Sequence, residues 1–412
     1  MALLLKNIAC LAGIATQNKL LRGSDLSALQ TISDAYLLIV GEQIAAYGTM
    51  SSLPTQYLGV ETQFDLQGQF VLPAWCDSHT HLVFPRSRED EFVDKLRGLS
   101  YAEIAAKGGG ILNSARQLNE MTEDALFALA WPRLQQAMQQ GTGAIEIKSG
   151  YGLTVEGELK MLRVIRKLKQ KSGLLIKATF LGAHAYPLDY RDNHDAYIRS
   201  IIEEMLPAIA QEKLADYVDV FCENGFFSPE ETQIICKAAA AYGLLPKLHV
   251  NQLNSIGGLH KAVALNAISV DHLEVMTDDD IECLAKASTI GTLLPTAAYF
   301  LRLPFPPARK MIDAGTAIAL ASDFNPGSSP GSNMHTVVSM ACIAMRMLPE
   351  EAINAATING AYAMQLENAV GSISVGKLAN LIITQPISSL AYIPYAFSSS
   401  PVAQVMHRGT FI

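Results

Sequence analysis

Two histidines separated by one residue stand where an apolar stretch of the sequence ends. The stretch from Val71 to His81 reads Val-Leu-Pro-Ala-Trp-Cys-Asp-Ser-His-Thr-His, and its apolar start predicts a buried strand. In an extended segment, residues i and i+2 face the same side, so His79 and His81 should project together. Two imidazoles on one side of a strand end make half of a transition-metal site. Two satisfied surface histidines would show the same spacing, so the other ligands must be sought elsewhere in the chain.

Other histidines also stand at the ends of apolar runs. The chain has nine histidines, and five of them end or follow such runs: His79, His81, His184, His249 and His272. Packing alone does not explain five such side chains at strand ends, because buried polar groups must be paired. The remaining four lie in helical or terminal contexts, where a core or solvated role is expected: His194, His260, His335 and His407.

A divalent metal fits best with four ligands: His79, His81, His249 and Asp323. Three neutral imidazoles and one carboxylate leave a position open for water or substrate, as in catalytic sites. The metal would lower the pKa of that water, and Asp323 could also take the proton that the water loses. His272 is placed to hydrogen-bond the water or a developing oxyanion. The alternative role for Asp323 is an Asx turn with Asn325.

Lys148 ends another strand-like run, at a place where some metal hydrolases carry a carbamylated lysine that bridges two metals. Ser-Gly-Tyr follows it in this sequence, and a site with one metal needs no bridge. We therefore expect Lys148 to belong to a polar network beside a single metal ion.

An anionic substrate is indicated by residues near these ligands. Arg88 lies just past the histidine pair, and a guanidinium binds a carboxylate through two hydrogen bonds. A surface ion pair with Glu89 or Asp90 is the alternative role for Arg88. The turn 325–329, with Gly327 and Ser328, offers backbone N–H groups as a second carboxylate seat. Neutral hydrogen-bonding groups around the pocket are expected from three residues: Tyr151, His184 and Gln252.

Eight apolar runs, most of them followed by a helical stretch, must position these residues. The runs end near His79, Lys148, His184, Glu223, His249, His272, Thr296 and Asp323. This alternation predicts an α/β fold with a (β/α)8 TIM-like barrel, in which side chains at the carboxyl ends of the strands converge on one axis. A doubly wound sheet also alternates, but it does not bring all its strand ends together. We expect the barrel to span residues 71–366.

Both ends of the chain carry short β segments punctuated by glycine. Residues 36–47 read as strand, turn and strand, and residues 370–384 and 402–412 have the same character. Short sheets need each other to bury a face, so we expect a small β-sandwich domain built from residues 1–70 and 367–412. Between the first two barrel strands, a short helix within Gly98–Gly110 and its glycine run make a candidate lid or a plain connector.

Composition excludes several classes of protein. The chain has 412 residues, 50% of them hydrophobic and 17% charged, which allows a large core and disfavours disorder. A net charge of -8 argues against nucleic-acid binding. The sequence contains no apolar run of the roughly 20 residues that a membrane-spanning helix needs, and no signal peptide is expected. The six cysteines form no Cys-x-x-Cys pair, which predicts free core thiols and a cytoplasmic location.

The motifs together resemble the amidohydrolase superfamily and, within it, the imidazolonepropionase family. The matching stretches are Asp77-Ser-His-Thr-His-Leu-Val-Phe, Ser87-Arg-Glu-Asp-Glu-Phe, Lys148-Ser-Gly-Tyr-Gly-Leu, Leu181-Gly-Ala-His, Val218-Asp-Val-Phe-Cys-Glu, Lys247-Leu-His, Asp271-His-Leu-Glu and Ala321-Ser-Asp-Phe-Asn-Pro-Gly-Ser-Ser-Pro. The His-x-His pair marks only the superfamily, whereas Arg88, Tyr151 and Ser-Asp-Phe-Asn-Pro-Gly-Ser mark the narrower family.

The resemblance implies hydrolysis of the cyclic amide 4-imidazolone-5-propanoate to N-formimidoyl-L-glutamate in L-histidine degradation, by attack of a metal-bound hydroxide. It implies one metal ion, Zn²⁺ or Fe²⁺/Fe³⁺, on the four ligands named above, with His272 and Asp323 as catalytic residues. Substrate contacts carry over to Arg88, Tyr151, His184, Gln252 and Ser328, and product contacts to Asn325 and Gly327. A homodimer is also implied.

Two other functions remain open at this point. A deaminase acting on an aminated heterocycle would share the superfamily's metal site, but such enzymes carry Glu three residues after the third metal histidine. This chain has Gln252 there, which cannot shuttle a proton, so the proton must pass to His272 or Asp323. A catalytically silent barrel used as a scaffold would be expected to have lost ligands, and here every expected ligand is present.

Overall fold

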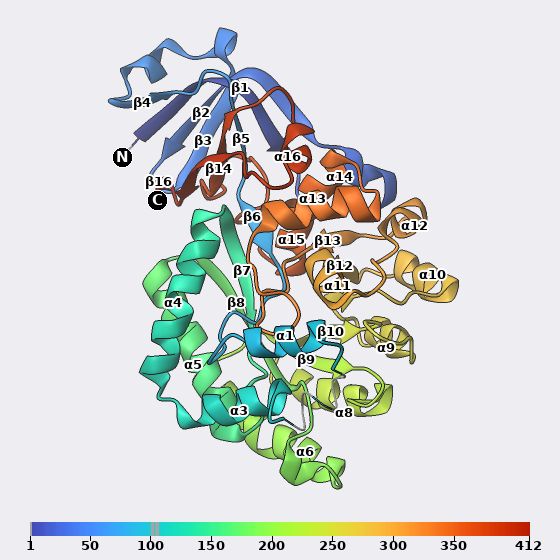
Figure 1. Ribbon diagram of the computed structural model, residues 1–412. Helices are drawn as coiled ribbons and strands as arrows, with labels where there is room; N and C mark the ends of the chain where they lie inside the picture. The colour runs from blue at the N-terminus through green and yellow to red at the C-terminus, as the bar shows by residue number, and fades with distance from the viewer. Residues whose placement is uncertain (1, 100–102, 104–106) are drawn as a thin grey trace.

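A computed structural model describes residues 2–99, 103 and 107–412 of the chain. Two sheets dominate it, a closed parallel barrel and a separate mixed sheet made from both chain ends, which lies at the top of the molecule in Figure 1. The architecture predicted from the strand-end pattern, a barrel with a small β domain of terminal segments, is confirmed.

The barrel strands run parallel in chain order, each beside its predecessor. The residues in the middle of each strand are buried on both faces of the sheet. This burial explains why the sequence of each strand is a nearly continuous apolar run. The strands are β6 (Trp75–Asp77), β7 (Thr142–Lys148), β8 (Leu175–Ala183), β9 (Tyr217–Cys222), β10 (Leu245–Val250), β11 (Ser269–His272), β12 (Ile290–Leu293) and β13 (Ile318–Leu320). All eight lie where the sequence predicted strands.

The first and last strands close the barrel just beyond their ends. His81 donates its backbone N–H to the Phe324 carbonyl at 2.9 Å, and Asp323 donates to the His79 carbonyl at 3.0 Å. The Ser322 hydroxyl donates to the Asp77 carboxylate at 2.6 Å. The closing hydrogen bonds therefore tie the histidine pair directly to the aspartate expected beside it.

Helices cover the outside of the barrel (Figure 1). Two of them begin with capping boxes, at Ser228 and Thr277. Among the described residues, no helix is long and apolar enough to cross a bilayer. The helices after the second strand are α5 (Val155–Ser172), α6 (His194–Ser200), α7 (Leu206–Glu212), α8 (Pro229–Ala240), α9 (Gly258–Ala264), α10 (Asp278–Lys286), α11 (Pro295–Leu301), α12 (Ala308–Asp313), α13 (Met334–Met345), α14 (Pro349–Ala356), α15 (Ile358–Ala363) and α16 (Tyr392–Tyr395).

The connection between β6 and β7 is long and carries helices of its own: α1 (Glu89–Leu96), α3 (Gly110–Glu120) and α4 (Glu123–Gln139). The last begins directly after Thr122, whose side chain caps it. The short helix expected within Gly98–Gly110 falls largely on residues 100–102 and 104–106, which lie outside the described residues.

The terminal sheet has the order β16-β15-β14-β5-β1-β2-β3, with β4 paired to β1. Its strands are β1 (Ala2–Ile14), β2 (Gln30–Val40), β3 (Gln43–Thr49), β4 (Thr62–Asp65), β5 (Gln69–Pro73), β14 (Leu381–Pro386), β15 (Val402–His407) and β16 (Thr410–Phe411). One expectation needs correction, because the stretch Val71–His81 is not a single strand. Its first residues belong to β5 in the terminal sheet, and only the three residues of β6 enter the barrel. The chain changes sheet at Ala74, whose N–H donates to Asn380 rather than to a barrel strand.

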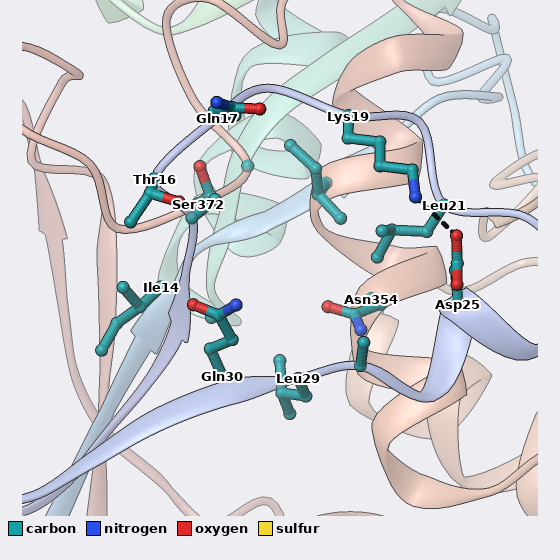
Figure 2. Close-up of a pocket in the computed structure, with 15 residues that line it drawn as sticks. Ile14, Thr16, Gln17, Lys19, Leu21, Asp25, Leu29, Gln30, Asn354 and Ser372 are labelled. Atoms are coloured by element: carbon teal, nitrogen blue, oxygen red, sulfur yellow. Dashed lines mark hydrogen bonds and ion pairs between the residues drawn. The ribbon is translucent and has the colours of Figure 1, made fainter.

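A cavity of about 270 Å³ with a mixed polar and apolar lining lies where the segment after β1 passes α14 and α15 (Figure 2). Lys19 and Asp25 form an ion pair of 2.6 Å on its wall, and the Asn354 amide holds the Leu26 carbonyl at 2.9 Å. None of its described lining residues belongs to the histidine cluster. The cavity is therefore distinct from the site at the strand ends.

Candidate active site

Three imidazoles and one carboxylate converge at the carboxyl ends of β6, β10 and β13. The Nε2 atom of His81 lies 3.3 Å from Nε2 of His79 and 3.3 Å from Nε2 of His249. Asp323 Oδ1 lies 3.5 Å from Nε2 of His79 and 3.6 Å from Nε2 of His81. The structure thus brings together all four residues that the sequence suggested as metal ligands.

These spacings fit a divalent ion. Zinc bonds to nitrogen of about 2.0–2.1 Å place tetrahedral ligand atoms about 3.4 Å apart. Burial is the main cause that lowers the pKa of His79, His81 and His249, so these imidazoles are neutral, which is the form that binds metal. A cation bound between the three imidazoles would accept the lone pairs of their Nε2 atoms, which otherwise face one another. The donor set therefore suits a zinc or iron ion.

Two buried carboxylates orient the imidazoles from behind. His79 Nδ1 lies 2.7 Å from Asp271 Oδ2, and His249 Nδ1 lies 2.7 Å from Asp219 Oδ2. Each carboxylate accepts the Nδ1 proton, which leaves Nε2 free of hydrogen on the side of the cluster. Asp219 was not singled out from the sequence, although a charged residue in the middle of the apolar run Tyr-Val-Asp-Val-Phe was a signal for it.

Lys148 lies directly below these carboxylates and is fully buried. Its Nζ is 2.7 Å from Glu146, 2.9 Å from Asp219 and 3.5 Å from Asp271. Burial alone would lower the pKa of Lys148, but the three carboxylates outweigh it and hold that pKa above its usual value. A protonated amine has no lone pair with which to form a carbamate. The geometry therefore places Lys148 in the polar network that the sequence led us to expect.

His272 and Asp323 face the cluster from backbone positions with positive φ, +92° and +51°. Burial disfavours the charged form of His272, but the carboxylate of Glu274, 3.3 Å from its Nδ1, raises the pKa of the imidazole. Burial also raises the pKa of Asp323 to about 6, against the attraction of His272. Both groups face the cluster and can take up or release a proton there.

A cavity of about 700 Å³ opens above the cluster. Every residue that the sequence suggested for substrate or product lies on its wall: Arg88, Tyr151, His184, Gln252, Asn325, Gly327 and Ser328. The same cavity is lined by four of the residues with metal-binding or catalytic chemistry: His81, His249, His272 and Asp323. Sequence reasoning missed the apolar part of the wall, which includes Ile111, Phe221, Phe226 and Leu301, and it missed Lys95.

Arg88 stands immediately before α1 and is held by that helix. Its Nε and Nη2 atoms donate to the same oxygen of Glu91 at 2.9 and 2.5 Å. The ion pair suggested with Glu89 or Asp90 is thus formed with Glu91, one turn along the helix. A Cβ on Gly327 would come within 2.6 Å of Nη1 of Arg88, so a larger residue there would displace the guanidinium.

The loop that carries Tyr151 is fixed by a buried carboxylate. Glu158 accepts the backbone N–H groups of Gly150, Gly152 and Leu153 at 2.9, 2.8 and 2.9 Å. His184 packs beside this loop, with Nδ1 3.0 Å from the Gly150 carbonyl. Burial lowers the pKa of His184 to about 4, so its ring is neutral in the cavity.

Another buried carboxylate fixes the loop around Gln252. Glu223 accepts the N–H groups of Leu253 and Asn254 at 2.8 and 3.3 Å. This glutamate was recognised only as the end of a strand, and nothing in its neighbouring sequence shows that it acts on a loop thirty residues away.

The turn 325–329 does not offer the free backbone N–H groups that we expected from the sequence. The N–H groups of Gly327 and Ser328 both donate to the Asn325 side chain at 2.8 Å. The idea that these backbone groups form a second carboxylate seat is therefore wrong, because an Asx-type turn already uses them. The Ser328 hydroxyl instead donates to Asp323 at 3.2 Å, so the turn supports the aspartate of the cluster.

Comparison with known proteins adds to this picture. The sequence model of a protein family described as "Amidohydrolase family" matches residues 70–412 of this chain. Imidazolonepropionase of Flavobacterium johnsoniae is 55% identical over 413 residues, covering 100% of each chain. Imidazolonepropionase of Christiangramia forsetii is 51% identical, also over 100% of both chains. Among solved structures, E. coli guanine deaminase has a TM-score of 0.76 at 12% identity, covering 100% of this chain and 99% of that one, a likeness of fold alone.

Proposed function

The chain belongs to the amidohydrolase family and, within it, to the imidazolonepropionases, and from that premise we propose how its residues perform the reaction. The protein is a hydrolase of histidine degradation that opens the cyclic amide of 4-imidazolone-5-propanoate to give N-formimidoyl-L-glutamate. The observation that carries our mechanism is one cavity, walled by Arg88, with the cluster of three imidazoles and Asp323 at its base.

We propose that one divalent ion, zinc or iron, is held by His79, His81, His249 and Asp323. When bound, such an ion lowers the pKa of a water molecule and polarises a carbonyl oxygen. The position of Lys148 supports a single metal ion. Its ammonium already lies beside the carboxylates of Glu146 and Asp219, which a second metal ion would need as ligands.

Hydrolysis adds water across the ring amide. The carbonyl carbon gains an oxygen, the C–N bond breaks, one proton of the water passes to the ring nitrogen, and the second proton is released to solvent as the new carboxylic acid ionises. Asp323 and His272 are the two groups placed to take the proton from water and return it to that nitrogen. His272 also supplies a hydrogen bond to the negative charge that develops on the carbonyl oxygen, and Glu274 holds its ring in place.

We propose that the rest of the wall positions the substrate. Arg88 binds the propanoate carboxylate, while Tyr151, His184, Gln252 and Ser328 contact the ring and its substituents. Asn325 and Gly327 contact the product. Gln252 also argues against a deaminase, because its amide holds no proton that it can shuttle.

We propose a barrel and a small terminal domain close to the predicted bounds of 71–366 and of 1–70 with 367–412, with the change of domain moved to Ala74, because β5 (Gln69–Pro73) lies in the terminal sheet. We also propose a cytoplasmic homodimer. Large apolar side chains are exposed on helices that pack together, Tyr299 on α11, Ile343 on α13 and Tyr395 on α16, and light scattering of the purified protein would test the dimer.

The test of the function uses purified protein with 4-imidazolone-5-propanoate. We expect loss of the imidazolone absorbance and formation of N-formimidoyl-L-glutamate. Treatment with a chelator should abolish turnover, and zinc or ferrous iron should restore it, with one ion per chain by elemental analysis. Full turnover by protein shown to be free of metal would refute the mechanism, and ammonia released from guanine without turnover of the imidazolone would favour the deaminase.

A further inference from the structure

Three charged residues lie along one side of α1 and its N-cap, and two of them, Arg88 and Lys95, lie next to Gly327 in the turn 325–329. Arg88, Glu91 and Lys95 are spaced i, i+3 and i+7, which places them along one side of a helix. Glu91 binds the Arg88 guanidinium through one oxygen and the Gly110 N–H through the other, at 2.8 Å. As a unit, the Arg88–Glu91 pair therefore carries no net charge.

Lys95 is the next cation on that face. Its Nζ donates to the Gly327 carbonyl at 3.1 Å, and its side chain lines the same cavity as Arg88 and Ser328. Among the described residues, the hydrogen-bond partner of Lys95 is this neutral carbonyl, and no carboxylate lies within ion-pair distance of its ammonium. Lys95 therefore brings to the cavity an amine that has no carboxylate in direct contact, although the charge of Glu91 acts on it from a distance.

The helix that carries Lys95 is anchored on both sides. Phe92 stacks on Phe300 of α11 with ring centroids 5.2 Å apart, and Arg88 lies against Gly327 at the other end of the helix. Anchoring lowers the entropy that would be lost when a long side chain is fixed by a ligand. The ammonium is thus held at the cavity wall before substrate arrives.

We propose that Lys95 is a specificity residue that binds the substrate carboxylate together with Arg88. This inference rests on the proposed function and deepens it. A carboxylate beside Arg88 alone also meets the charge of Glu91, so Arg88 supplies direction through its fixed N–H groups while Lys95 supplies the net attraction. The seat therefore selects ring substrates with an anionic side chain over neutral ones of similar size.

The experiment compares the full-length wild type with Lys95→Met and Lys95→Arg. We expect Lys95→Met to raise the KM for 4-imidazolone-5-propanoate by about 10- to 100-fold, as expected for loss of one charge-assisted hydrogen bond, with kcat changed much less. Lys95→Arg should recover most of the loss. Lys107→Met is the matched control, since that lysine pairs with Asp94 at 3.1 Å and lies outside this cavity, and its KM should stay at the wild-type value.

Direct binding of glutarate, a dicarboxylate that needs no turnover, separates this inference from the proposed function. Calorimetry should show weaker glutarate binding to Lys95→Met than to wild type. Unchanged KM and unchanged glutarate binding in Lys95→Met would overturn the assignment, as would a loss that Lys95→Arg fails to recover. A wild type that binds glutarate through Lys95 but does not hydrolyse the imidazolone would overturn the proposed function instead.

Discussion

The ammonium of Lys148 lies 2.9 Å from the Asp219 carboxylate, the same group that accepts the Nδ1 proton of His249 at 2.7 Å. Asp271, which holds His79 in the same way, lies 3.5 Å from that ammonium. One buried lysine is thus linked to both carboxylates that orient the imidazoles. The orientation of two proposed metal ligands depends on a charge that touches neither of them.

Replacement of Lys148 by Met should weaken both the fold and the metal site. The change leaves Asp219 and Asp271 without this cation, while Glu146 keeps Lys247 at 3.0 Å, and breaking a buried pair in this way costs about 3–5 kcal/mol. Metal affinity should fall about 10- to 100-fold, as for other changes behind metal ligands. Urea denaturation and metal titration against a competing chelator measure the two effects.

A milder variant guards against simple failure to fold. Asp219→Asn keeps the shape and the acceptor oxygen but removes one charge, so it should fold and still lose metal affinity. Unchanged metal affinity in both variants would contradict the role given to this network.

Replacement of Glu158 by Gln should loosen the loop that presents Tyr151. The carboxylate accepts three backbone N–H groups (150, 152 and 153), and a neutral amide would place an NH₂ group against at least one of them. We expect a loss of about 1–3 kcal/mol in unfolding free energy from the unsatisfied donor, together with a higher KM. Thermal denaturation and steady-state kinetics check these results, and a KM at the wild-type value would show that the loop does not need this anchor.

Much of the site could be predicted because it depends on local rules. His79 and His81 share a side by strand periodicity, and the barrel hypothesis placed His249 and Asp323 at the same rim. Each prediction needed only the identity of a residue and its place at the end of an apolar run.

The parts that could not be predicted depend on contacts between distant segments. Glu223 acts on the loop around Gln252, and Lys95 reaches Gly327 across more than two hundred residues. The division of Val71–His81 between two sheets also follows from pairing with β14, a partner three hundred residues away. Such partners have no signature in the neighbouring sequence, because many buried or charged residues share the same local pattern.

Arg88 and Glu91 should behave as a coupled pair. Arg88→Met should raise the KM for the propanoate substrate with a smaller effect on kcat, since the guanidinium contacts a remote carboxylate in both ground and transition states. Glu91→Gln should raise KM as well, because the guanidinium loses the partner that fixes its direction. In the double variant the two effects should not add. An Arg88→Met enzyme with the wild-type KM would remove Arg88 from the carboxylate seat.

His407 should make the stability of the protein depend on pH. The imidazole is buried in the terminal sheet, and burial lowers its pKa from 6.5 to about 4. Between these values the unfolded chain binds a proton that the folded chain does not, so stability falls as the pH drops from about 6.5 towards 4. The difference between the two pKa values corresponds to about 3 kcal/mol at the acid end of this window. His407→Gln removes the titrating group, so the free energy of unfolding of the variant, measured by urea denaturation at several pH values, should lose that part of the slope. A variant slope equal to that of the wild type would show that His407 does not exchange its proton on unfolding.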